Sequence, residues 1–324
     1  MRGCNCRHGG VCGLLGVAVL LGGGRPAEAQ RPTTEAQKQA EEILQRKDAS
    51  LRRMRLDALL AILQDAAAPP ASQKESLGVL LRVRDVPFER APFLAAAKPL
   101  LASPDEQVRA AALVALPGLN AGEADLPAMA KLADDPAGAV REGVVGSLFF
   151  AKGAGNPALV GPIVEKLLAD PDPKVKLATL NALWGNPVSP AAEAQIIALS
   201  RETTAGLSGS LGYDAVYYAL STRPVVRLPV ATRLAELMHD PNLDPNIRWR
   251  AAWGLAHTAA PEAVDAMVAA LITELDETLQ PQVRSYAVQG LAAHRTPAAL
   301  AKLREMAEKE ENPRLRAEAA RAVQ

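Results

Sequence analysis

The chain has 324 residues, with 36 basic and 36 acidic side chains and a formal net charge of zero. A balanced charge argues against a general nucleic-acid binder, because such a protein needs a basic surface to displace the counterions of phosphates. Glycine and proline, with 23 and 25 residues, are too few and too irregularly placed for a collagen-like or low-complexity chain. The composition therefore favours a folded, nearly neutral protein without a nucleic-acid partner.

The first 29 residues have the pattern of a secretory signal peptide. Arg2 and Arg7 precede an apolar stretch over 11–21, and Ala27-Glu28-Ala29 supplies the small residues of a cleavage site. The apolar stretch is shorter than the roughly 20 residues that span a bilayer, so we expect cleavage rather than a membrane anchor. We therefore expect an exported protein, periplasmic or extracellular, with no integral membrane segment after cleavage. High alanine and arginine usage suggests a bacterial source.

All cysteines lie in this first segment, at Cys4, Cys6 and Cys12. Together with His8 they could form a metal site, but they would be lost on cleavage, and no second ligand cluster follows. We therefore expect no metal and no cofactor. A mature chain without disulfides must be stabilised by its core alone.

One pattern recurs along the rest of the chain. An aliphatic residue is followed by a base, and small or apolar residues come four, seven and eight places after the aliphatic one, as in Val108-Arg109…Ala112…Ala115-Leu116. The first position of each copy is Ser72, Val108, Val140, Val175, Gly212, Ile247, Val283 or Leu315, and the copies at Ser72 and Gly212 are weak. The spacing between copies is 32 to 37 residues. A nearly constant period of this length is typical of a repeat protein.

Each copy predicts the second helix of a helical hairpin. The aliphatic residue and the residues four, seven and eight places after it lie on one face of a helix. A second segment with apolar residues at helical spacing precedes each clear copy. Asp135-Pro136, Asp170-Pro171 and Asp240-Pro241 separate the two helices, since proline ends one helix and is tolerated at the start of the next. No stretch alternates with a two-residue period, so no strands are predicted.

These copies resemble the HEAT-repeat family, whose second helices have the pattern D-P-x-x-x-V-R-x-x-A-x-x-A-L, over about residues 51–324. The resemblance implies an all-α fold, an α-α superhelix described as a HEAT-like solenoid of about eight helical hairpins. It places first helices on the convex side and second helices on the concave side. Residues 30–50 are predicted to be a linker and a polar capping helix at 33–47, and Glu308–Arg321 is predicted to close the other end.

The base at the second position of each copy has a structural interpretation. Its regular recurrence opposite the Asp residues of the turns predicts a ladder of ion pairs and carbonyl caps between repeats. The bases are Arg109, Arg141, Lys176, Arg248, Arg284 and Arg316. The charges at 308–311 are interpreted as a solvated helix face. His257 and His294 lie near the ends of second helices, where we expect capping rather than metal binding.

The sequence contains no motif that predicts catalysis. H-E-x-x-H, the phosphate-binding lysine loop and G-x-S-x-G are all missing from it. Residues 153–158 fit a loose G-x-G-x-x-A, but they follow a predicted helix instead of the strand that a dinucleotide site needs. We therefore predict a non-enzymatic protein without catalytic, cofactor-binding or metal-binding residues.

Aromatic residues make up only 3% of the chain, so their positions are informative. Six lie in consecutive second helices and are predicted to bind a partner: Trp184, Tyr217, Tyr218, Trp249, Trp253 and Tyr286. Their positions are largely opposite the core stripe, and aromatic rings on a rigid face are typical binding anchors. The alternative, that these rings fill the seams between neighbouring helices, stays open.

The leading functional hypothesis is an exported, non-enzymatic HEAT-repeat scaffold that binds a protein or peptide on its concave face. One alternative is a small-ligand-binding or lyase-like HEAT protein that uses the aromatic groove, because some similar solenoids, such as bilin–protein lyases, are catalytic. A third hypothesis is an accessory subunit of an envelope complex with no site of its own.

Overall fold

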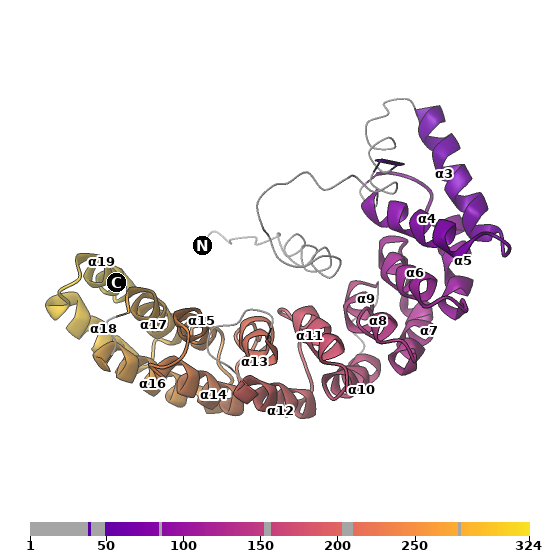
Figure 1. The fold of residues 1–324 in the computed structure, drawn as a ribbon. Coiled ribbons are helices and arrows are strands. Elements are labelled where there is room, and N and C mark those ends of the chain that lie inside the picture. Colours follow the sequence, from indigo (N-terminus) through magenta and orange to yellow (C-terminus); the bar gives the residue numbers. More distant parts are fainter. Residues whose placement is uncertain (1–37, 40–48, 84–85, 152–156, 203–209, 278–279) are drawn as a thin grey trace. The chain divides into compact units, whose positions relative to one another are not determined.

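A computed structural model describes residues 38–39, 49–83, 86–151, 157–202, 210–277 and 280–324 (Figure 1). The chain divides after Thr179 into two compact units, unit 1 and unit 2. The predicted signal peptide, nearly all of the capping helix at 33–47 and most of the glycine-containing loop at 153–158 lie outside the described residues. In the ranges that are described, no helix combines the length and apolar character needed to cross a membrane.

Unit 1 is built from helices that follow one another as pairs. They are α3 (Ala49–Gln64), α4 (Pro70–Arg82), α5 (Ala91–Ala97) with η1 (Lys98–Ala102), α6 (Glu106–Gly118), η2 (Glu123–Asp125), α7 (Leu126–Ala130) with η3 (Lys131–Asp134), α8 (Gly138–Arg141), α9 (Val144–Phe150), α10 (Pro157–Leu168) and α11 (Pro173–Ala182). The last residues of α11 already belong to unit 2.

Unit 2 continues the same arrangement. Its elements are α12 (Pro190–Leu199), η4 (Ser200–Glu202), α13 (Leu211–Asp214), the π-helical turn η5 (Ala215–Leu220), α14 (Leu228–His239), α15 (Pro245–Leu255), η6 (Pro261–Ala263), α16 (Val264–Glu277), α17 (Pro281–His294), α18 (Pro297–Lys309) and α19 (Pro313–Ala322). Within unit 2, the helices α12, α14, α16 and α18 form one row, and α13, α15, α17 and α19 form the other (Figure 1). The described residues contain no named strand, and one isolated parallel bridge joins Val226 and Ala259.

The predicted register of the second helices is confirmed. Val108 lies two residues after the start of α6, and the first positions of the other seven copies likewise fall within the first turn of α4, α8, α11, α13, α15, α17 and α19. The first positions of the six clear copies are buried. Asp105 shows why such a helix begins where it does, because its carboxylate accepts the N–H groups of Gln107 and Val108. The fold is all-α, as predicted.

Small residues allow close approach between helices at two positions in unit 2. A Cβ atom on Gly254 would lie 2.9 Å from the Cα of Ser221 and 2.9 Å from the Cδ1 of Leu234. A Cβ atom on Gly290 would lie 2.6 Å from the Cδ1 of Leu271. At Gly254 the obstacle is backbone, which cannot move aside as a side chain can, so glycine is needed there for packing.

Gly254→Ala is expected to destabilise unit 2 by about 1–3 kcal/mol, because the added methyl group overpacks the contact with Ser221. The matched control is Gly161→Ala within α10, where a Cβ atom meets nothing within 4 Å. Removing glycine from an open helical position should stabilise by about 0.5–1 kcal/mol. Urea unfolding followed by circular dichroism measures both effects, and a Gly254→Ala variant as stable as the parent would contradict the packing.

Candidate functional site

Four aromatic rings of unit 2 surround one guanidinium group. The Cζ atom of Arg250 in α15 lies 3.9 Å from the ring centroid of Trp253, 4.2 Å from Tyr217, 4.8 Å from Trp184 and 5.7 Å from Trp249. These distances are within the range of cation–π attraction. The rings come from the turn that follows α11, from η5 and from α15. We call Arg250, these four rings and the neighbouring rings of Tyr213, Tyr218 and Tyr286 the aromatic–arginine cluster.

Ring-to-ring contacts extend the cluster over neighbouring hairpins. The Trp184 centroid lies 5.7 Å from Tyr218 and 6.1 Å from Tyr217, and Trp249 stacks on Tyr286 of α17 at 5.7 Å. The structure thus brings all six predicted partner-binding residues into one cluster. Trp184 is 41% exposed, and the other five are half-buried. The rings therefore fill the seams between hairpins and also reach the surface, so the two interpretations of the sequence both describe part of their arrangement.

Arg250 is a functional candidate that the sequence interpretation missed. The residue is 6% exposed, and its Nε donates to the Ser221 Oγ at 3.0 Å and to the Tyr217 carbonyl oxygen at 3.3 Å. No carboxylate within the described ranges forms an ion pair with it. Burial lowers the pKa of Arg250 from its usual value, as expected for a cation removed from water. The sequence signal that could have indicated Arg250 is its position between Trp249 and Trp253, two residues after the ladder residue Arg248.

The π-helical turn η5 explains why Tyr217 offers its carbonyl group. The N–H of Ser221 bonds to the Val216 carbonyl at 3.0 Å, five residues earlier, so the regular four-residue pairing is lost. The Tyr217 carbonyl then accepts the Ser221 hydroxyl at 3.1 Å in addition to Arg250. π-helical turns are rare, and many of them lie at functional sites.

Hydrogen bonds fix the backbone on both sides of Trp184, the most exposed ring. Arg223 is 2% exposed, and its Nη2 donates to the Leu183 carbonyl at 2.8 Å, directly before Trp184. On the other side, the N–H of Gly185 donates to the Thr222 Oγ1 at 3.2 Å. Gly185 has a φ of 67°, which favours glycine. Burial lowers the pKa of Arg223 to about 10. The protein thus fixes the position from which Trp184 projects.

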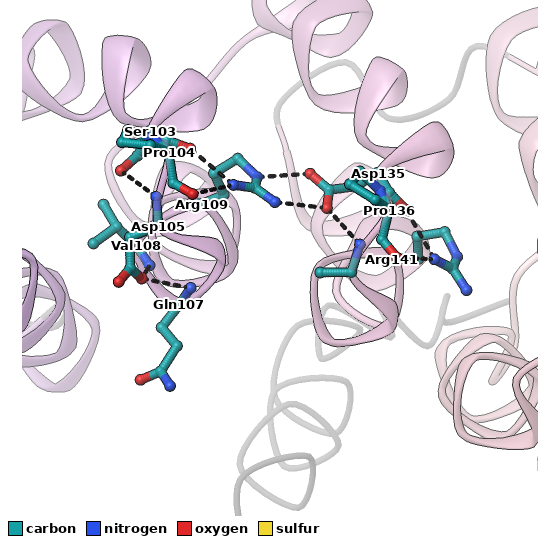
Figure 2. A network of polar contacts seen from close by, with 10 residues as sticks. Ser103, Pro104, Asp105, Gln107, Val108, Arg109, Asp135, Pro136 and Arg141 are labelled. Atoms are coloured by element: carbon teal, nitrogen blue, oxygen red, sulfur yellow. Dashed lines mark hydrogen bonds and ion pairs between the residues drawn. The ribbon is translucent and has the colours of Figure 1, made fainter.

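The predicted ladder between repeats is confirmed for Arg109, Arg141, Arg248 and Arg284, and Figure 2 shows one step of it in unit 1. Among the other two bases, Arg316 caps the Glu310 carbonyl oxygen at 2.8 Å, and Lys176 forms no ion pair within the described residues. Arg109 donates from Nε and Nη2 to the carboxylate of Asp135, at 2.7 and 2.8 Å, and from Nη1 to the carbonyl oxygens of Ser103 and Pro104. Arg141 repeats this arrangement with Asp170, at 2.7 and 2.9 Å. The base at this position is therefore structural.

In unit 2 the acceptors of the ladder are glutamates instead of turn aspartates. Arg248 bonds Glu274 at 2.8 Å, and Arg284 bonds Glu310 at 2.5 Å. The Glu310 side chain is only 11% exposed, so the interpretation of 308–311 as a solvated face is wrong for this residue. The error has a simple cause, since a charge run looks the same in sequence whether or not a base of the preceding repeat reaches into it.

The ladder predicts how stability depends on pH. Hydrogen bonds from Arg109 and Arg141 hold the pKa values of Asp135 and Asp170 below their usual values. A depressed carboxyl pKa stabilises the folded state above the unfolded pKa of about 3.9, and the stabilisation is lost as the pH falls through the folded value. We therefore expect stability to decline below about pH 5. In Asp170→Asn the decline should be shallower, as measured by urea unfolding from pH 7 to pH 3, and an unchanged slope would contradict this assignment.

His257 and His294 lie where the sequence predicted caps. The Nδ1 of His257 lies 2.8 Å from the Trp253 carbonyl oxygen, and the Nε2 of His294 lies 2.9 Å from the Leu255 carbonyl oxygen. Both acceptors belong to the last turn of α15, so His257 contacts the end of its own helix, whereas His294, at the end of α17, contacts the end of the preceding second helix. His257 also packs edge-on against Trp253, with 4.2 Å between ring centroids. The part of the chain that the structure describes contains no group of three or more side chains able to hold a metal ion.

Comparison with known proteins agrees with this architecture. Residues 230–324, from within α14 to α19, match the family model described as HEAT repeats. The fold is an α-α superhelix of the HEAT-like class. Among curated proteins, none matches the chain.

Several solved structures are similar to this chain at low sequence identity, and one of them has a TM-score above 0.5. A chain in a homology model of the full-length AP-3 complex in an intermediate open conformation is 12% identical with a TM-score of 0.56, and the match covers 97% of this chain and 58% of that chain. An engineered protein is 17% identical with a TM-score of 0.47, over 89% and 88% of the two chains. Kap121p, in a crystal structure with bound Nup53p, is 13% identical with a TM-score of 0.38, over 89% and 36%.

Proposed function

We propose that this chain is an exported, non-enzymatic HEAT-repeat scaffold that binds a protein or peptide through the face of unit 2 that carries the aromatic–arginine cluster. The observation that carries the proposal is the set of partly exposed rings, contributed by successive hairpins and held around one buried cation. Aromatic rings in a fixed arrangement lose little conformational entropy on binding, so they are effective anchors.

The arrangement favours a macromolecular partner over a small flat ligand. Arg250 occupies the space between Trp184, Tyr217 and Trp253, with its guanidinium 3.9–4.8 Å from the three ring centroids. A flat ligand inserted between these rings would have to displace a buried cation from its acceptors. A partner that lies across the outer edges of the rings needs no such displacement, and the repeat architecture offers it a surface that continues onto Tyr286.

Selection from a displayed library of random peptides tests the proposal. Binders of the intact protein should be enriched, and Trp184→Ala should lose them, because Trp184 is the most exposed ring. Leu228→Ala is the matched control, since Leu228 is 40% exposed but belongs to the other row of helices, at the start of α14. Enrichment that survives Trp184→Ala, or no enrichment at all, would overturn the proposal.

Export belongs to the same proposal and has a separate test. Cleavage after the Ala27-Glu28-Ala29 segment would leave Gln30 as the first residue. Expression of the full chain in a bacterial host, followed by fractionation and N-terminal sequencing, should give an exported protein that begins at Gln30. An uncleaved chain retained in the cytoplasm would contradict export without affecting the proposed binding face.

A further inference from the structure

The aromatic–arginine cluster offers hydrogen-bond donors as well as ring surfaces. Within the described chain, the indole N–H groups of Trp184 and Trp253 donate to no acceptor, whereas that of Trp249 donates to Asn246 at 3.1 Å. The phenol hydroxyls of Tyr217 and Tyr218 likewise form no hydrogen bond within the described ranges. Partly exposed aromatic donors of this kind are suited to a ligand that presents acceptors and apolar surface together.

The charge within the cluster selects against one class of ligand. Aromatic rings arranged around a point often bind a cation, but Arg250 already supplies the cation here, with four ring centroids between 3.9 and 5.7 Å from its Cζ. A second cation would be repelled by this buried, uncompensated charge. Carbonyl oxygens are attracted by it, so the cluster is complementary to a ligand rich in acceptors.

The spacing of the repeats indicates the shape of that ligand. The rings come from successive second helices or, for Trp184, from the turn directly after one, and packed helices lie about 8–10 Å apart. A polyproline II helix has about three residues per turn and rises about 3.1 Å per residue, so one turn advances about 9 Å. Every third residue of such a peptide can therefore meet the next hairpin. Its backbone carbonyl groups form no internal hydrogen bonds and remain free to accept donors such as the indole N–H of Trp184.

From these three features we infer that the aromatic–arginine cluster binds a proline-rich segment in the polyproline II conformation, supplied by a partner protein. This inference rests on the proposed function and names the partner's chemistry. Proline rings pack on the outer edges of Trp184, Tyr217 and Trp253, and the peptide carbonyls accept the free indole and phenol donors. The conformation is already formed in the free peptide, so little entropy is lost on binding.

Tryptophan fluorescence provides a direct test, because all three tryptophans of the chain, Trp184, Trp249 and Trp253, lie in the cluster. Titration with acetylated decaproline should give a saturable change in emission, and a glycine–serine peptide of equal length should give none. Trp184→Ala should weaken decaproline binding about tenfold or more, as expected for an exposed anchor. Leu228→Ala should bind as the parent does. Trp184→Phe, which keeps a ring but loses the N–H, should be intermediate.

The outcomes separate this inference from the proposed function. No saturable response to decaproline at millimolar concentration, or an equal response in Trp184→Ala, would overturn the polyproline assignment. If the library selection nevertheless enriches peptides without proline that depend on Trp184, the proposed function stands and only the partner class is wrong. Enrichment of sequences with proline at every third position would support both.

Discussion

Arg250→Met is expected to lower the free energy of unfolding of unit 2 by about 3 kcal/mol. Methionine keeps most of the side-chain volume, so the loss comes mainly from the charge. The substitution removes the cation–π attraction to four rings, each about 0.5–2 kcal/mol, and the hydrogen bonds to Ser221 and Tyr217. Part of this loss is offset, because the folded variant no longer has to keep the charged Arg250 side chain away from water. Urea unfolding followed by tryptophan emission measures the change.

Two variants show whether the geometry of the guanidinium is the cause. Arg250→Lys keeps the charge but loses the planar group that stacks on rings, so most of the destabilisation should remain. Arg314→Met alters a side chain that is 81% exposed and should change stability by less than about 0.5 kcal/mol. A lysine variant as stable as the parent would show that charge alone holds the cluster together.

Asp135→Ala is expected to destabilise unit 1 by about 3–4 kcal/mol. The substitution leaves the guanidinium of Arg109, whose side chain is 13% exposed, without its paired carboxylate. Breaking a buried ion pair by removing one partner costs this much because a charge remains without compensation. The N–H of Ala137 also loses its acceptor at 2.9 Å. Circular dichroism should show the lower stability, while the tryptophan transition of unit 2 should change little.

A double-mutant cycle with Arg109→Met isolates the ion pair. If the pair is the cause, the double variant should be clearly more stable than the sum of the two single losses predicts, with a coupling of about 1–3 kcal/mol. Additive losses would instead indicate that Asp135 acts only through the turn at Ala137. Since neighbouring repeats are joined mainly by such local terms, the cycle measures one link of the array.

The sequence predicted the fold because each hairpin repeats the same local rules. Val108 and its counterparts mark the buried face of a second helix, and the Asp-Pro pairs mark where the helix begins, so helix register could be predicted from spacing alone. The ion-pair partner of a ladder base could be predicted for Arg109 and Arg141 of unit 1, whereas Lys176 of the same unit forms no ion pair within the described residues. In unit 2, Glu310 is a glutamate at the turn position that Asp135 and Asp170 occupy in unit 1, and Glu274 lies within α16 instead of a turn.

The centre of the candidate site could not be predicted, because it depends on a departure from the repeat. The weak copy at Gly212 loses the base, and its helix continues into the π-helical turn η5. Tyr217 thereby presents a carbonyl group to Arg250, a contact between residues 33 positions apart. Regular helical periodicity contains no sign of a five-residue hydrogen bond. The aromatic positions were visible in the sequence, but the cation between them was not.

The ladder also has a consequence for how a repeat array can lengthen during evolution. Arg109 and Asp135 are 26 positions apart, as are Arg248 and Glu274, so each donor finds its acceptor in the hairpin that follows. A duplicated segment of one period would bring both halves of this contact with it. Gene duplication can therefore lengthen the array without redesigning any junction, and later divergence of a single copy, as around Tyr217, can create a specialised surface within an otherwise uniform protein.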